Sequence, residues 1–92
     1  MTDKRELIFI EPASCNRYIT SVIFWGRDGD KHVRCEIDQD ALADHFGLYD
    51  KTRSLLKAFE SNKAVIEHEA RRKYLAHKLQ PDGSVFIKNE DL

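Results

Sequence analysis

The sequence predicts a two-layer α+β domain, in which an antiparallel sheet of about four strands carries two helices on one face in the order β-β-β-α-α-β. Three observations lead to this prediction. β-Branched and aromatic side chains are dense in the first forty positions, residues 51–79 contain no Pro or Gly, and a short apolar run returns at 84–88. Strands followed by helices favour a sheet with its helices gathered on one side. We expect the 92 residues to form one domain.

The expected strands cover residues 7–10, 18–27, 30–37 and 84–88. The first is a continuous apolar run that Glu11-Pro12 ends, because proline cannot donate to a strand ladder, and residues 13–16 are expected to form a loop. Residues 31–37 alternate between polar and apolar side chains, as in a half-buried strand. Asp28-Gly29 lies between the two longer runs and predicts a hairpin with a two-residue turn.

The register of this hairpin decides which side of the sheet is buried. With Asp28 and Gly29 as the two loop residues, Phe24 lies opposite Val33 on a uniformly apolar face. A three-residue loop with a bulge at Gly29 would shift the pairing by one residue and make Trp25 a core residue. We prefer the two-residue turn. The second face then sets apolar residues of one strand opposite polar residues of the other: Ile19, Ile23, Trp25, His32, Arg34 and Glu36.

The first helix is expected over residues 39–46. Asp38 is a good N-cap, and Ile37 and Leu42 are spaced to pack together around that cap. Gly47 can adopt the left-handed conformation that ends many helices. Helix 39–46 is therefore short and acidic.

The second helix is expected over residues 51–79, with Asp50 or Thr52 as its cap and Pro81-Asp82-Gly83 as the turn beyond it. One stripe at helical spacing should face the sheet: Leu55, Leu56, Phe59, Ile66, Ala70 and Tyr74. The apolar residues off that stripe are Val65, Leu75 and Leu79. They predict either a bend near Ser61-Asn62 or a second contact surface.

The order of several short segments resembles a family of small bacterial proteins, domain of unknown function 1488. The matching segments are Val22-Ile23-Phe24, Val33 to Asp38 followed by Ala41-Leu42, Phe46-Gly47, Ala58-Phe59 with Asn62-Lys63, Ile66-Glu67 with Ala70, and Asp82 to Val85. The resemblance covers nearly the whole chain and implies the same β-β-β-α-α-β fold. It implies no activity and no catalytic residues.

Catalytic and metal-binding patterns are not found in the sequence. His68 and His77 are nine residues apart on one predicted helix, so they point in opposite directions, and no histidine or cysteine pair has zinc spacing. Cys35 lies among core-facing positions, and Cys15 has no base near it in the sequence. We therefore expect no enzyme activity, no metal and no cofactor.

The first apolar run is four residues long, too short for a signal peptide or a membrane helix. The two cysteines do not form a C-x-x-C pair, and we expect them to stay reduced. These observations predict a cytoplasmic protein without a membrane partner.

The formal net charge of −1 hides a separation of charge along the chain. Residues 51–79 hold eight basic and three acidic side chains, a net charge of +5, which leaves −6 for the remainder. Arg71, Arg72 and Lys78 could contact nucleic acid. The alternative is a solvated helix face, with Glu67–Arg71 and Glu69–Lys73 pairs one turn apart.

Two hypotheses about function follow. The first is a non-enzymatic binding or accessory domain that contacts a second copy or another protein through Ile19, Ile23, Trp25, His32 and Arg34, since exposed apolar strips commonly mark contacts. The alternative is a nucleic-acid-binding regulator that uses Arg71, Arg72 and Lys78, although no nucleic-acid motif accompanies them.

Overall fold

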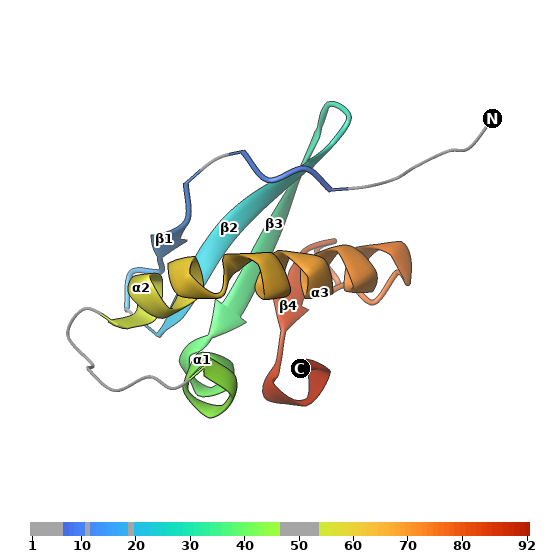
Figure 1. The fold of residues 1–92 in the computed structure, drawn as a ribbon. Helices are drawn as coiled ribbons and strands as arrows, with labels where there is room; N and C mark the ends of the chain where they lie inside the picture. Colours follow the sequence, from blue (N-terminus) through green and yellow to red (C-terminus); the bar gives the residue numbers. More distant parts are fainter. Residues whose placement is uncertain (1–6, 11, 19, 47–53) are drawn as a thin grey trace.

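The computed structural model describes residues 7–10, 12–18, 20–46 and 54–92 (Figure 1). These residues form a four-stranded sheet in the order β1-β2-β3-β4, three α-helices and a final 3-10 turn. The α+β class and the order of elements are confirmed, although the strand near the N-terminus is displaced and the helices number three rather than two. The elements are β1 Ser14–Cys15, β2 Ser21–Asp28, β3 Lys31–Asp38, α1 Gln39–Phe46, α2 Ser54–Ser61, α3 Lys63–Leu75, β4 Val85–Ile87 and η1 Asn89–Asp91.

The β2–β3 hairpin has the predicted two-residue turn, but the loop residues are Gly29 and Asp30 instead of Asp28 and Gly29. Gly29 has a φ of 64° and Asp30 is not in the positive-φ region, which is the pattern of a type II′ turn. Phe24 therefore pairs with Cys35 and not with Val33. The predicted register was wrong by two positions. Because side chains alternate with a period of two, both faces of the hairpin keep the predicted residues.

The N-terminal segment differs from the prediction. Residues 7–10 form a single antiparallel bridge, Ile8 to Arg27, and β1 lies within the expected loop at 13–16. Leu7 is fully buried, and the ring centroid of Phe9 lies 5.5 Å from that of Phe24. At Gly26, a Cβ would meet a ring carbon of Phe9 at 3.0 Å. Leu7 and Phe9 therefore pack on the core, whereas Ile8 and Ile10 are exposed, and the segment does not add a full strand to the sheet.

β4 pairs with β3 in parallel, with Glu36 opposite Phe86, whereas the sequence analysis expected an antiparallel sheet throughout. A long helical connection permits either direction, so the strand sequences themselves do not determine it. Helix α3 crosses the sheet, and residues 76–84 lead from its end into β4, which points in the same direction as β3 (Figure 1).

Helix α1 spans the predicted residues, and its N-terminus is capped as expected. Oδ1 of Asp38 accepts a hydrogen bond of 2.9 Å from the Ala41 backbone N–H. Ile37 and Leu42 are both fully buried on either side of the cap. The other expected helix-end residues, Gly47, Asp50 and Thr52, lie outside the described residues.

The expected long helix is divided at Asn62, so the bend, one of the two alternatives, is present. Asn62 leaves the helical conformation, with φ at −125°, and its Nδ2 donates to the Ala58 carbonyl at 2.9 Å. Helix α3 then ends at Leu75, four residues before the predicted end.

His77 terminates α3 in the left-handed conformation, with a φ of 59°. Its N–H donates to the Tyr74 carbonyl at 3.1 Å, and the Lys78 N–H donates to the Lys73 carbonyl at 2.9 Å. These two bonds form a Schellman motif, which in most helices has glycine at the position of His77.

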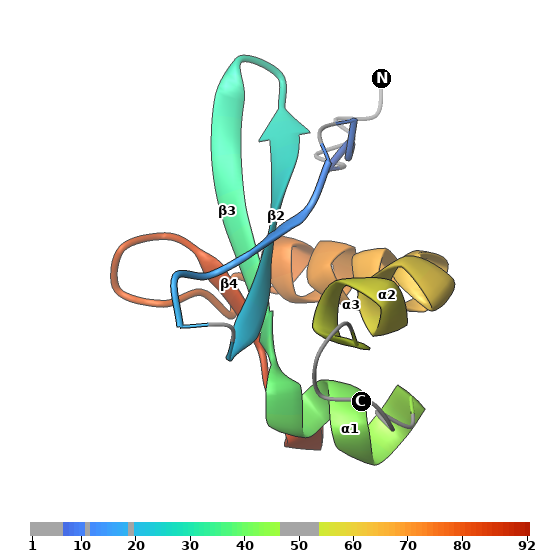
Figure 2. The same cartoon turned by 90° about the vertical axis from the view of Figure 1, so that its left-hand side faces the viewer.

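Helices α2 and α3 lie against one face of the sheet, and α1 lies at its end (Figure 2). Every residue of the predicted helical stripe is buried except Leu56, which is 36% exposed. Phe24 and Phe59 join the two layers, with ring centroids 4.9 Å apart. The buried core also contains Leu7, Val22, Val33, Cys35, Ile37, Ala41, Leu42, Leu55, Ile66, Ala70, Tyr74, Val85 and Ile87.

Candidate functional site

The sheet face opposite α2 and α3 gathers most of the residues that the sequence analysis proposed for a contact surface. Strands β2, β3 and β4 place five side chains there, which we call the open face: Ile23, Trp25, Arg34, Glu36 and Phe86. The register aligns Ile23, Glu36 and Phe86 in one row across the sheet and sets Trp25 opposite Arg34. Ile19, also expected here, lies outside the described residues.

The apolar side chains of the open face are half-buried. Ile23, Trp25 and Phe86 all belong to this intermediate class, whereas Tyr18 is 73% exposed. Trp25 packs edge-on against the exposed ring of His32, with centroids 6.4 Å apart and planes at 87°. The predicted apolar strip is therefore present on the expected face, but it is partly shielded by its polar neighbours.

Glu36 lies at the centre of the polar contacts on the open face. Its Oε1 is 3.3 Å from Nη2 of Arg34, and its Oε2 accepts a hydrogen bond from the hydroxyl of Ser21, which is buried. The Arg34 side chain remains 43% exposed and that of Glu36 24%. Glu36 is thus fixed in place, while the guanidinium of Arg34 can still reach a partner.

A shallow hollow of about 480 Å³ adjoins the open face, between β3, β4 and the turn at residues 80–84. The turn is rigid because Asp82 Oδ1 accepts bonds from both the hydroxyl and the N–H of Ser84, at 2.7 and 3.0 Å. These bonds, together with the charge of Arg34, lower the pKa of Asp82. The hollow therefore places a carboxylate beside the exposed guanidinium of Arg34.

Reactive groups do not converge on this site. The thiol of Cys35 faces the core, and burial raises its pKa to about 12, so it stays protonated at neutral pH. Within the described residues, no group of three or more His, Cys, Asp or Glu side chains could hold a metal ion.

The three basic residues proposed for nucleic-acid binding have separate surroundings. Arg71 Nε donates to the Leu7 carbonyl at 2.9 Å, and its guanidinium lies 5.1 Å from the ring centroid of Phe9. Arg71 therefore fastens the N-terminal segment to α3.

Arg72 makes two hydrogen bonds to the carboxylate of Glu69, at 2.6 and 3.1 Å, and this carboxylate raises the pKa of Arg72. Glu69 thus bonds Arg72 instead of the expected Lys73. Lys78 is exposed beyond the end of α3. The structure does not assemble Arg71, Arg72 and Lys78 into one row of unengaged cations.

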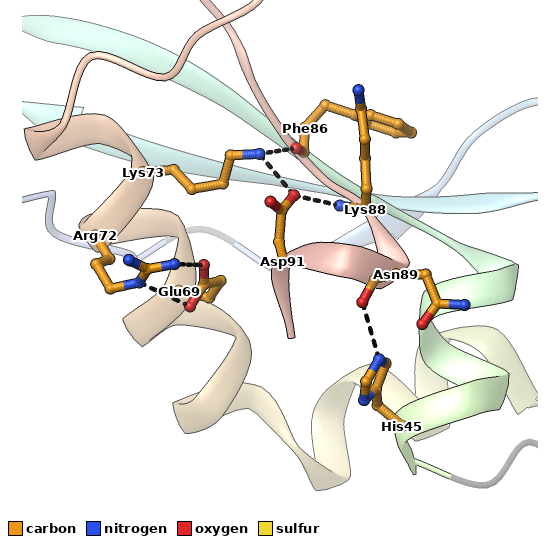
Figure 3. A network of polar contacts seen from close by, with 8 residues as sticks. All are labelled: His45, Glu69, Arg72, Lys73, Phe86, Lys88, Asn89 and Asp91. Carbon is orange, nitrogen blue, oxygen red and sulfur yellow. Dashed lines mark hydrogen bonds and ion pairs between the residues drawn. The ribbon is translucent and has the colours of Figure 1, made fainter.

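One group that was not predicted joins α3 to β4 and to the C-terminal turn (Figure 3). The ammonium of Lys73 is 2.6 Å from Oδ2 of Asp91 and donates to the Phe86 carbonyl at 2.8 Å. The same Asp91 oxygen accepts the Lys88 N–H at 2.8 Å. We call Lys73 and Asp91 the terminal pair. No pattern in the sequence indicates the terminal pair, because Lys73 and Asp91 are eighteen residues apart. The other partner of Lys73 is a backbone carbonyl, which no side chain in the sequence marks.

Burial alone would raise the pKa of Asp91, but its hydrogen bonds from Lys73 and the Lys88 backbone, with the charge of Lys73, hold that pKa below its usual value. Asp91 is therefore ionised throughout the neutral range. The turn η1 that carries it is also bonded to α1, where Nε2 of His45 donates to the Asn89 carbonyl at 3.0 Å.

None of the helices in the described segments is long and apolar enough to cross a membrane. The family model described as a protein of unknown function (DUF1488) matches residues 7–87. A crystal structure of a protein of unknown function from that family, from Shewanella loihica PV-4, has a TM-score of 0.80 and 17% sequence identity. The similarity covers 94% of this chain and 96% of that chain, and at this identity it shows a shared fold. No curated protein matches the chain.

Proposed function

Because the chain belongs to the DUF1488 family, whose description gives no activity, we propose its function from its own surface: a small, non-enzymatic binding domain that contacts another protein through the open face. We take a second copy of the chain as the first partner to test. The uncovered side of the sheet carries this proposal, since the helices pack against the other side and leave Trp25, Ile23 and Phe86 at the surface.

The residue types of the open face support a protein partner. Aromatic residues and arginine are enriched in protein interfaces, and they dominate binding energy where water is excluded around them. Trp25 and Phe86 supply the aromatic area, and Arg34 is exposed beside them. Half-buried aromatic side chains lose little conformational freedom on binding, which reduces the entropic cost of association.

We further propose that the domain acts in the cytoplasm. Both Cys15 and Cys35 are free thiols. Free thiols are consistent with a reducing compartment, where disulfides rarely persist.

Sedimentation velocity across protein concentrations from ~1 μM to ~1 mM tests self-association, because this range covers weak to moderate affinities. We expect the average mass to rise with concentration and the fluorescence of Trp25, the single tryptophan, to change with it. Arg34→Glu should weaken association about tenfold or more, a loss of ~1.4 kcal/mol. Lys57→Glu makes the same charge change on α2 and should leave association unchanged.

A chain that stays monomeric across this range, with constant Trp25 emission, would refute self-association through the open face. Equal weakening by Arg34→Glu and Lys57→Glu would show that net charge, and not the open face, controls association.

The nucleic-acid alternative receives less support, because Arg71 and Arg72 are engaged within the fold. A titration with duplex and single-stranded DNA and RNA at ~50 and ~200 mM salt separates the two functions, since phosphate contacts weaken steeply with salt. We expect no binding at either concentration. Tight binding that disappears at the higher salt concentration would favour the alternative.

A further inference from the structure

The outer edge of β4 is a surface that the proposed function does not use. β4 is the last strand in the sheet order, so among the described segments one of its edges has no neighbouring strand. In a parallel pair, alternate residues of a strand direct their main-chain groups to the same side. The Phe86 carbonyl and the Lys88 N–H bond to Lys73 and Asp91, so we take the main-chain groups of Phe86 and Lys88 to point away from β3.

The terminal pair occupies two of the main-chain groups at this edge. The ammonium of Lys73 donates to the Phe86 carbonyl, and Asp91 accepts from the Lys88 N–H, each at 2.8 Å. The two side chains are only 8% and 20% exposed. The charges are thus withdrawn from water and held against the strand edge.

This bonding copies one residue of an added parallel strand. Such a residue donates its N–H to the carbonyl of residue i and accepts the N–H of residue i+2 with its own carbonyl. Here Lys73 provides the donor at residue 86 and Asp91 the acceptor at residue 88. A strand that bonded to these same groups would have to displace the terminal pair.

We propose that the terminal pair is an edge lock, which prevents β4 from pairing with the β4 strand of a second copy. The segment Val85-Phe86-Ile87 is uncharged and rich in β-formers, the kind of edge that pairs readily when it is open. A second copy is the fitting occupant, because two β4 edges placed antiparallel about a two-fold axis offer the same groups to each other. The inference concerns the sheet edge and is independent of the open face.

Contacts with α1 and with the core hold the turn that carries Asp91. Its turn bonds to α1 through the hydrogen bond between His45 and Asn89, and a second bond joins the Asn89 amide to Asp44. Leu92 packs against the core just beyond Asp91. The terminal pair thus joins α3, β4 and the C-terminal turn, and loss of either charge should open the edge.

Sedimentation velocity on Lys73→Met and Asp91→Asn, each combined with Arg34→Glu, tests the edge lock. The Arg34→Glu change disables the open face, so that association through β4 is measured separately from the proposed function. We expect both variants to dimerise at about tenfold lower concentration than Arg34→Glu alone. Arg72→Met is the matched control, since it removes an exposed charge from the adjacent position of α3 and should have no effect.

Far-UV circular dichroism and Trp25 fluorescence establish that each variant is folded. If Lys73→Met fails to fold, Asp91→Asn decides the test, because it preserves the side-chain volume and leaves Lys73 and Leu92 in place. A synthetic peptide of residues 83–89 is a second probe: it should bind Asp91→Asn but not the unaltered chain. The same peptide methylated on the Phe86 nitrogen should bind neither. The edge lock is refuted if Asp91→Asn folds, has the same average mass in sedimentation as Arg34→Glu alone, and does not bind the peptide.

Discussion

Replacing His77 by glycine should stabilise the protein, an unusual direction for a change to a more flexible residue. His77 has a φ of 59° at the position that closes the Schellman motif of α3. The left-handed conformation brings Cβ too close to the backbone in every residue except glycine. The His77 side chain is exposed, so its removal sacrifices little packing.

The expected gain is the difference between two terms. Relief of the left-handed conformation contributes ~1–2 kcal/mol. Glycine loses ~0.5–1 kcal/mol more than other residues in conformational entropy on folding. The net stabilisation is then ~0.5–1 kcal/mol, which raises the Tm of a chain of this size by ~2–8 °C.

Thermal unfolding and urea denaturation at pH 7, monitored by circular dichroism, provide the measurement. Ala76→Gly is the matched control, because Ala76 precedes His77 with a φ of −84° and gains nothing from glycine. We expect the control to lose ~0.5–1 kcal/mol. A His77→Gly variant as unstable as Ala76→Gly would show that the left-handed turn does not strain the helix end.

Three further predictions concern the buried thiol of Cys35, the guanidinium of Arg71 and the carboxylate of Asp91. A maleimide at pH 7 should label Cys15 in the folded protein but reach Cys35 only on unfolding, because burial raises the pKa of Cys35 to about 12; mass spectrometry that finds equal labelling would contradict this. Arg71→Met should speed amide exchange at Ile8, measured by NMR, because it removes the bond to the neighbouring Leu7 carbonyl; an unchanged rate would show that this bond does not hold the segment. Asp91→Asn should cost ~1–3 kcal/mol at pH 7, the worth of its charge-assisted hydrogen bonds. The pKa of Asp91 is lowered in the folded protein, so this stabilisation is complete above about pH 4 and is lost as the pH falls through the folded pKa. Urea denaturation of wild type and variant measures the difference in their free energies of unfolding. A difference that stays constant down to about pH 2 would refute the prediction.

Local patterns in the sequence were sufficient for much of this fold. Alternation in β3 identified which residues face the core, and this assignment survived an error of two positions in the register because side chains repeat every second residue. The cap at Asp38 and the stripe from Leu55 to Tyr74 depend on contacts within one or two turns. The bend at Asn62 was one of two alternatives drawn from the apolar residues off the stripe, and Val65 and Leu75 nevertheless stay 53% and 56% exposed.

Features that depend on contacts between residues far apart in the sequence could not be predicted. The direction of β4 depends on where α3 delivers the chain, and residues 84–88 contain no information about that point. The turn residue was missed because Gly29 can occupy either position of a two-residue turn. The engagement of Arg71 and Lys73 was hidden because their partners include backbone carbonyls, which every residue possesses.

The open face contains residues that were predicted from the sequence and one residue that was not. Trp25, Ile23 and Arg34 were correctly assigned to the side away from the helices. The contribution of Phe86 was missed because it depends on the register of β4 against β3, which places Phe86 opposite Glu36. Half-burial of Trp25 likewise depends on the ring of His32 on the neighbouring strand.

The parallel pairing of β3 with β4 also determines the order in which the sheet can be completed. The hairpin of β2 and β3 closes over a two-residue turn, an event of ~1–10 μs. β4 can join only after the chain has passed through all three helices, and such non-local closure is slow because it costs more entropy. During synthesis, the outer edge of β3 therefore stays open until Val85 to Ile87 leave the ribosome. Residues 85–92 complete the sheet and close its edge together, so a variant without them would expose β3 to aggregation even if every helix had formed.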